Sequence, residues 1–189
     1  MDIARRVIPR VPAAAGAPRL TVVTPQRGRG AMPTSEELNE LVREGVRVRV
    51  IGDRSRFDPD TQAELDRAER ATLGNSRLNL NVALSYGARD EIVAAARAVA
   101  EAAAAGRLDP ATLDEAGFAR FLYTAGMPDP DLVIRTSGEC RLSNFLLWQS
   151  AYAELVFLDV LWPDFGAAEF DGALAEFARR ERRFGVRPG

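Results

Sequence analysis

The sequence contains no histidine, so imidazole can serve neither as a catalytic base nor as a metal ligand. It contains a single cysteine, Cys140, which excludes an internal disulfide and a cysteine-based zinc cluster. No apolar run approaches the length of a transmembrane helix. We expect no signal peptide, because the first residues lack its apolar core. Any chemistry must therefore rest on carboxylates, hydroxyls, arginines and the backbone.

A strong charge of one sign is also missing. The formal net charge is -2 at pH 7 and no basic block stands out, which argues against a nucleic-acid partner. A chain of 189 residues, 47% of them hydrophobic, suits one globular domain with its own core. We expect a cytoplasmic protein without a transmembrane segment, with a place at the membrane periphery as the alternative.

Hydrophobic periodicity predicts strands that alternate with helices. The expected strands are 20–24, 46–51, 78–84 and 131–134. The expected helices are 34–44, 58–73, 90–105, 113–123 and 167–183. This alternation predicts an α/β fold: a single domain with a largely parallel central sheet flanked by helices. Ligands of such sheets bind outside the carboxyl ends of the strands, where Arg135 and the segment 85–89 follow their strands.

The stretch 130–165 contains most of the polar residues that are candidates for binding a ligand. A buried strand delivers Arg135, two hydroxyls and a glycine to a turn, and Arg141 follows. Ser143 is expected to be the N-cap of a helix over 145–148. Guanidinium groups, hydroxyls and helix N-terminal amides all favour a phosphate or diphosphate. Glu154 and Asp159 lie just beyond and can hold a hard cation such as Mg²⁺. Surface ion pairs without any ligand remain the alternative.

The segment 134–165, IRTSGECRLSNFLLWQSAYAELVFLDVLWPDF, closely resembles the C-terminal signature of the cis-prenyltransferases, the undecaprenyl diphosphate synthase family. Those enzymes extend an allylic diphosphate with isopentenyl diphosphate in Z geometry. Further resemblances follow in the family's order at 45–53, 78–91 and 182–185. The resemblance implies an N-terminally truncated, diverged member, with an irregular or short helical N-terminus over 1–18 and a cis-prenyltransferase-like domain over 19–189.

The resemblance also implies roles for individual residues. Those that match the ligands of the isopentenyl diphosphate are Arg135, Arg141 and Ser143, and the match to Glu154 helps to bind Mg²⁺. The C-terminal Arg183-Phe184-Gly185 matches a motif that reaches across a dimer into the partner's site, so that Arg183 and Gly185 join the diphosphate-binding set. Arg89 is a further candidate, since it follows a strand at the ligand-binding edge.

The sequence departs from the family where the allylic diphosphate would bind. The family's Asp-Gly-Asn-Gly-Arg-Trp loop, whose aspartate anchors the catalytic metal, has no counterpart here, so no catalytic residue is assigned. The next family motif, Phe-Ser-x-Glu-Asn-Trp, is replaced at 25–30 by PQRGRG. The helix after it is shorter than the family's. Smaller changes are Ser137 for a glycine and Ser-Tyr-Gly-Ala at 85–88 for Asn-Tyr-Gly-Gly.

Three functions stay open, and we rank them in this order. The first is a diverged subunit of a dimeric cis-prenyltransferase, either a homodimer or a heterodimer with a full-length member; the family includes two-component enzymes with one catalytically poor subunit. The second is a self-sufficient prenyltransferase with a short or irregular product, in which Arg27 and Arg29 replace the lost loop as diphosphate ligands. The third is a non-catalytic binder of isoprenoid diphosphates.

Overall fold

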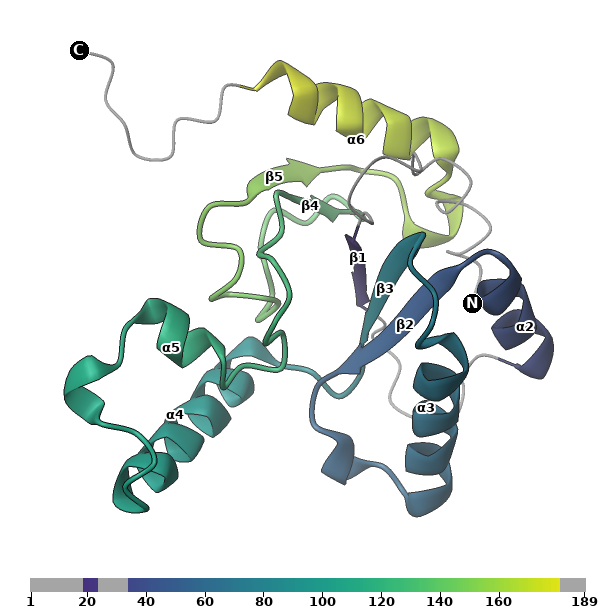
Figure 1. The fold of residues 1–189 in the computed structure, drawn as a ribbon. Coiled ribbons are helices and arrows are strands. Elements are labelled where there is room, and N and C mark those ends of the chain that lie inside the picture. The colour runs from purple at the N-terminus through teal and green to yellow at the C-terminus, as the bar shows by residue number, and fades with distance from the viewer. Residues whose placement is uncertain (1–18, 24–33, 181–189) are drawn as a thin grey trace, which may run out of the picture. The chain divides into compact units, whose positions relative to one another are not determined.

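The computed structural model describes residues 19–23 and 34–180 (Figure 1). The chain divides into two compact units, Met1–Tyr86 and Gly87–Gly189, and each is described by itself. The predicted domain boundary between residues 18 and 19 stays a prediction, since 1–18 lie outside the described residues.

The first unit is built on a three-stranded parallel sheet with the order β1-β3-β2. Its strands are β1 (Arg19–Val23), β2 (Val46–Ile51) and β3 (Leu78–Ala83). The central strand β3 pairs with both neighbours, so that Leu80 lies opposite Leu20 on β1 and Val48 on β2. Four successive residues of β3 are buried, as expected for a parallel strand covered on both faces.

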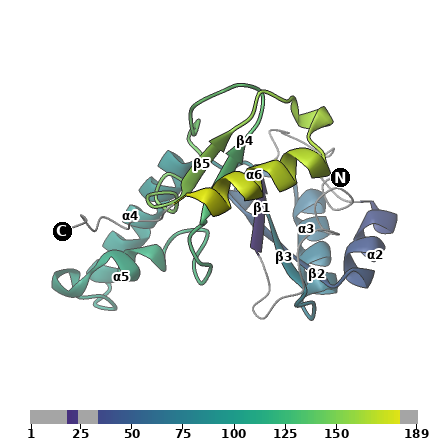
Figure 2. The same ribbon diagram turned by 90° about the horizontal axis from the view of Figure 1, so that it is seen from above.

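Two helices cover this sheet beside β2: α2 (Ser35–Arg43) and α3 (Pro59–Thr72) (Figures 1 and 2). Thr34 caps α2 in a capping box. The Thr34 hydroxyl accepts from the amide of Glu37 at 3.2 Å, and the Glu37 carboxylate accepts from the amide of Thr34 at 2.8 Å. The side chain of Asp58 caps α3 by accepting from the amide of Thr61 at 3.0 Å, and a proline follows at the first helical position. Local sequence signals therefore fix where both helices begin.

The core of this unit consists of aliphatic side chains from the two helices and the strands, almost all of which are below a tenth exposed. They are Leu41, Val46, Val48, Val50, Leu65, Leu78, Leu80, Val82 and Leu84, with Phe57 packed against them. Gly52 follows β2 with φ +122°, and a Cβ at that position would lie 2.0 Å from the carbonyl oxygen of Leu84. Only glycine allows the chain to pass this close to the end of β3.

Side chains from α3 and the turn after it cover the free edge of β2. The amide of Val48 donates to the Thr72 hydroxyl at 3.0 Å, and the amide of Val50 donates to the Glu69 carboxylate at 2.6 Å. The Asn75 amide group donates to the carbonyl of Val46 at 2.8 Å. An edge strand otherwise presents unpaired backbone groups. Here the helix that buries the sheet also satisfies its edge.

The second unit holds a two-stranded parallel sheet and three α-helices in its described part. The strands are β4 (Leu132–Arg135) and β5 (Glu154–Phe157), paired so that Arg135 lies opposite Phe157. The helices are α4 (Ala88–Ala104), α5 (Glu115–Ala119) and α6 (Ala167–Arg179). Helix α6 packs against β5. The short 3-10 helices among the described residues are η3 (Arg54–Arg56) in the first unit, and η4 (Pro110–Thr112) and η5 (Trp162–Asp164) in the second.

The predicted α/β class is confirmed, with parallel strands flanked by helices. The helix expected over 113–123 is short, since α5 is a five-residue helix followed by turns. Strand β5 was not expected from the sequence. None of the helices in the described part of the chain combines the length and apolar character needed to cross a membrane.

The helix expected after Ser143 is wrong. Ser143, Asn144 and Leu146 have φ values of 47°, 64° and 41°, which are left-handed, whereas a right-handed helix needs negative φ. The segment 145–152 consists of bends and turns. Ser143 therefore caps no helix.

Substitution of Thr72, whose side chain is completely buried, tests the covered edge of β2. We expect Thr72→Val to lower the free energy of unfolding by about 2 kcal/mol, because it leaves the amide of Val48 buried without an acceptor. The control is Thr112→Val, whose exposed hydroxyl donates only to the nearby carbonyl of Asp109; its effect should stay within about 0.5 kcal/mol. Urea unfolding of both variants measures the difference, and equal effects would contradict the assigned role of Thr72.

Candidate oxyanion site

The loop that leaves β4 is fastened to the chain that follows β5. The carbonyl of Arg135 accepts from the amide of Leu158 at 2.8 Å. The amides of Ser137 and Gly138 donate to the carbonyls of Val160 and Leu158 at 2.8 and 3.0 Å. Both donors have left-handed φ, 71° and 66°, so the chain turns sharply at this point. The start of the predicted signature is therefore a fixed turn at the carboxyl end of a parallel strand, as expected for a ligand site.

Arg135 and Arg141 converge on one carboxylate. Nη2 of Arg135 donates to Oε2 of Glu139, and Nη2 of Arg141 donates to Oε1 of the same residue at 2.6 Å. The side chain of Arg135 is 26% exposed and that of Arg141 is 65% exposed. The structure thus brings together two of the predicted ligands and aims both at one oxyanion. Glu139 was not singled out from the sequence.

This geometry leaves donors for a larger anion. Each guanidinium carries five N–H groups in a planar fork that suits phosphate as well as carboxylate. Nε of Arg135 is buried and has no hydrogen-bond partner among the described residues. Buried donors are normally satisfied, so a buried one without a partner needs an explanation. A surface ion pair without a ligand would not require a buried, unsatisfied guanidinium nitrogen.

Asn144 fastens the far end of the loop to α4. Its carbonyl accepts from the amide of Ala88 at 2.8 Å, and its Oδ1 accepts from the amide of Arg89 at 2.8 Å. These bonds bring the backbone of Arg89, a further predicted ligand, beside Asn144 and the adjacent Ser143. Sequence reasoning missed Asn144. The signal was present, since α4 follows a glycine that has no side chain to cap it.

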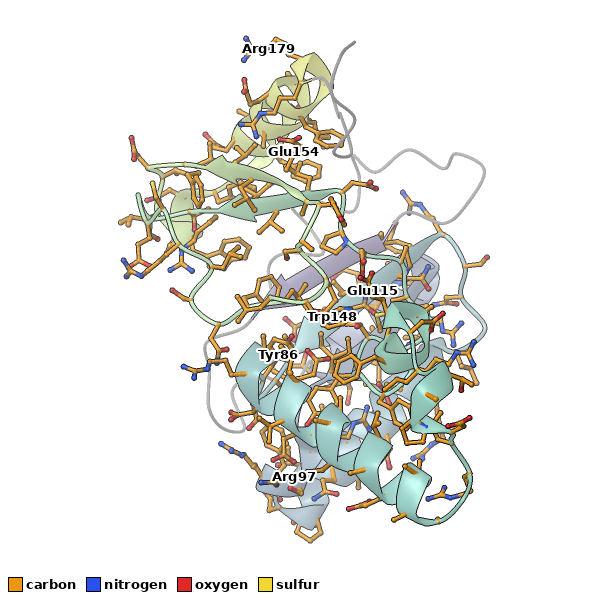
Figure 3. The ribbon with its side chains drawn as sticks, turned by 90° about the vertical axis from the view of Figure 1, so that its left-hand side faces the viewer. Tyr86, Arg97, Glu115, Trp148, Glu154 and Arg179 are labelled. Carbon is orange, nitrogen blue, oxygen red and sulfur yellow. The ribbon has the colours of Figure 1, made fainter. Side chains whose placement is uncertain are left out.

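A buried polar network anchors the chain that follows this loop. The carboxylate of Glu91 on α4 is 1% exposed and accepts from the amide of Tyr123 at 2.7 Å. Gln149 donates to that carboxylate at 3.3 Å and to the hydroxyl of Thr124 at 2.9 Å. The ring of Trp148 lies 4.7 Å from that of Phe118 on α5 (Figure 3). The apolar run expected to be helical is instead an irregular segment held by these contacts.

Glu154, the predicted Mg²⁺ ligand, is paired with an internal cation. Nη1 of Arg180 donates to Oε2 of Glu154 and to the carbonyl of Leu155, both at 2.9 Å. Nε of Arg180 donates to Glu176 at 3.1 Å. Hydrogen bonds to Glu154 and then to Glu176 raise the pKa of Arg180. Figure 3 shows Glu154 on β5 beside α6, whose last residue is Arg179.

The hydrogen bond from Arg180 and the charge of Arg179 lower the pKa of Glu176 below its ordinary value. A lowered carboxyl pKa stabilises the fold above the ordinary value, and this stabilisation is lost as the pH falls through the lowered value. The attachment of the end of α6 should therefore hold at neutral pH and weaken in acid.

At this position the described residues offer a cation one carboxylate, that of Glu154, and not a set of several protein ligands. Within the described ranges, no group of three or more acidic, cysteine or histidine side chains is placed to hold a metal ion. Mg²⁺ commonly binds through one or two carboxylates together with substrate phosphates and water. Glu154 fits such a site if Arg180 releases its carboxylate. Arg27, Arg29, Arg183 and Gly185 lie outside the described residues.

The comparisons with known proteins point to a single family. A family model described as "Putative undecaprenyl diphosphate synthase" matches residues 30–185. The chain is 56% identical over 149 residues to isoprenyl transferase 2 of Bradyrhizobium diazoefficiens, covering 79% of this chain and 59% of that protein. It is 54% identical over 150 residues to a ditrans,polycis-undecaprenyl-diphosphate synthase of Xanthomonas axonopodis pv. citri described as (2E,6E)-farnesyl-diphosphate specific, covering 79% of this chain and 58% of that enzyme. The chain therefore spans less than two thirds of the length of these curated relatives.

Two solved structures are also similar. One is lavandulyl diphosphate synthase from Lavandula x intermedia in complex with dimethylallyl diphosphate, with a TM-score of 0.75, 34% identity, and coverage of 89% of this chain and 79% of that one. The other is a "probable undecaprenyl diphosphate synthase" from Campylobacter jejuni, with a TM-score of 0.69, 39% identity, and coverage of 79% of this chain and 69% of that one.

The ion pair of Arg180 and Glu154 can be tested by cation binding. We expect Arg180→Gln to tighten Mn²⁺ binding by roughly threefold or more at low salt, since it removes a positive charge from the carboxylate. Arg179→Gln is the matched control, because Arg179 pairs with Glu176 instead. Titration calorimetry with Mn²⁺ measures both. Equal affinities in the two variants would mean that Arg180 does not compete with a cation for Glu154.

Proposed function

Because this chain belongs to the undecaprenyl diphosphate synthase family, which its match over residues 30–185 shows, we propose that it binds the diphosphate of isopentenyl diphosphate and acts as one subunit of a dimeric cis-prenyltransferase. The observation that carries the proposal is the convergence of Arg135 and Arg141 on one carboxylate. In this proposal the enzyme condenses isopentenyl diphosphate with an allylic prenyl diphosphate.

The proposed binding step is an exchange of anions. Glu139 carries one negative charge and engages one nitrogen of each guanidinium. A diphosphate carries more charge and more acceptor oxygens, so it can engage additional N–H groups, including the buried Nε of Arg135. The side chain of Arg141, which is more exposed than that of Arg135, would contact the ligand from the solvent side. Ser143 and Arg89 are the further proposed ligands.

A substitution at 25–30 is the reason that we assign different steps to this chain and to a partner subunit. At 25–30, where family members carry a glutamate and an asparagine, the sequence has PQRGRG. Ionisation of an allylic diphosphate separates charge and needs preorganised donors with a metal. We therefore assign this step to a catalytically complete partner subunit. This chain supplies the isopentenyl diphosphate site and, through Arg183 and Gly185, a contribution to the partner's site.

Glu154 is the residue that would hold Mg²⁺. When bound, the metal neutralises negative charge on the diphosphate. The contribution of the chain is to present the Glu154 carboxylate at the start of β5, fixed by Arg180 until a cation takes its place. The parallel register sets Glu154 opposite Leu132 at the start of β4, whereas Arg135 lies opposite Phe157 at the carboxyl ends of both strands, about 10 Å further along.

A second candidate function is a self-sufficient prenyltransferase with a short or irregular product. The similarity to the lavandulyl diphosphate synthase structure, which reaches 89% of this chain, favours it. In this case Arg27 and Arg29 would bind the allylic diphosphate in place of the family's loop. A non-catalytic binder of isoprenoid diphosphates is the third candidate, with the same binding site and no turnover.

Binding of isopentenyl diphosphate is the first test. We expect Arg141→Ala to weaken it by roughly tenfold or more, because a charge-assisted pair is lost. The melting temperature should stay unchanged, since the Arg141 side chain is largely exposed. The control is Arg97→Ala, which removes an equal charge from an exposed position on α4 (Figure 3). Calorimetry and thermal melts measure both variants. Wild-type protein that binds no isopentenyl diphosphate would remove the basis of all three functions.

Turnover separates the candidates. We expect the protein alone to convert little labelled isopentenyl diphosphate with farnesyl diphosphate and Mg²⁺. Addition of a full-length family member should give more product than that member produces alone at the same concentration. Turnover by the isolated protein would favour the self-sufficient enzyme. Ligand binding with neither turnover nor an effect on the full-length member would leave only the non-catalytic binder.

A further inference from the structure

The loop 136–143 is held at both of its ends. At the start, the amides of Ser137 and Gly138 donate to the carbonyls of Val160 and Leu158. At the end, Asn144 accepts from the first two amides of α4, at 2.8 Å in each case. Arg141 lies between the two attachments. The position of its guanidinium relative to Arg135 therefore depends on both attachments.

The attachment through Asn144 is chemically specific. The residue adopts φ +64°, a left-handed conformation that asparagine tolerates better than most residues. Its carbonyl and its side-chain oxygen together satisfy two of the amides that a helix N-terminus leaves unpaired. Asn144 thereby occupies the first two amides of α4, so the start of this helix holds the loop in place.

Gly87 makes room for this attachment. A Cβ at Gly87 would lie 2.8 Å from Nδ2 of Asn144, too close for an ordinary contact. Its φ of -151° is an extended value that any residue can adopt. Backbone conformation therefore does not require glycine here, but a methyl group at this position would push the Asn144 side chain out of its place. Gly87, which precedes α4, and Asn144, at the end of the loop, therefore lie against each other.

We propose that Asn144, seated against Gly87 at the N-terminus of α4, is a positioning residue that holds Arg141 and Ser143 in place for the diphosphate. The inference rests on the proposed function, since it assigns a role within the same site. A loop fixed in advance loses less conformational freedom when a ligand binds, so its affinity is higher. Asn144 acts through Arg141 and Ser143 and need not touch the ligand.

Two variants test the contact from its two sides. Asn144→Gly keeps the left-handed backbone and the carbonyl and removes only the side-chain bond to Arg89. Gly87→Ala adds one methyl group against the side chain of Asn144. We expect each to weaken the binding of isopentenyl diphosphate and of inorganic pyrophosphate by roughly five- to tenfold in calorimetry on the full chain.

Asp114→Gly is the matched control. Asp114 caps α5 in the same unit, where its Oδ1 accepts from the amide of Gly117 at 2.7 Å. Its loss should lower the melting temperature about as much as Asn144→Gly does, yet leave both affinities at the wild-type value. A merely structural role for Asn144 predicts that the two variants behave alike.

Two results would overturn the inference while the proposed function stands. One is wild-type affinity in both Asn144→Gly and Gly87→Ala. The other is equal weakening by Asp114→Gly, which would show a general loosening of the unit. Wild-type protein that binds neither probe would instead refute the proposed function, and the role of Asn144 with it.

Discussion

Two positive charges are held against a single negative one at the carboxyl end of β4, and the second unit of this protein is organised around that arrangement. Guanidinium groups repel one another unless an anion lies between them. Glu139 supplies that anion. Because it bonds to both arginines, it also keeps them oriented toward a common point. The electrostatic stabilisation of a later guest is therefore arranged in advance, which is the condition under which such groups act most strongly.

This arrangement requires an unusual backbone. Ser137, Ser143, Asn144 and Leu146 all have left-handed φ, which costs about 1 kcal/mol or more for each residue that is not glycine. The surrounding contacts offset that cost. Hydrogen bonds hold the two ends of the loop, and Leu146 is 3% exposed. Strain of this kind persists only where the neighbouring structure overdetermines it, and it is often found at functional sites.

The sequence predicted the helices and strands that are specified by neighbouring residues. It did not predict the contacts between residues that lie far apart in the sequence. Strand β2 matches its predicted range of 46–51, and α2 (Ser35–Arg43) lies within its predicted range of 34–44, because alternation and capping act within a few residues. The apolar run after Ser143 appeared helical by composition, which cannot distinguish a helix from a buried turn. Its conformation depends on the hydrogen bonds between Asn144 and α4. One of these joins Asn144 to Arg89, which is 55 residues away in the sequence. The convergence of Arg135 and Arg141 on Glu139 likewise depends on the backbone geometry of the turn at Ser137 and Gly138, which the sequence pattern does not predict.

Glu154, the proposed metal ligand, is also held in an ion pair within the chain. Glu154 pairs with Arg180 as Glu139 pairs with its two arginines, so these charged groups all have partners within the chain. If a diphosphate alone displaced Glu139, negative charge would accumulate at the carboxyl end of β4, where Arg135 lies. If a cation alone displaced Arg180, it would gain one carboxylate and little else. Each guest supplies the charge that the other lacks. On the proposed function, diphosphate and Mg²⁺ should therefore bind together more readily than either binds alone, and the two internal ion pairs hold the charged side chains in place.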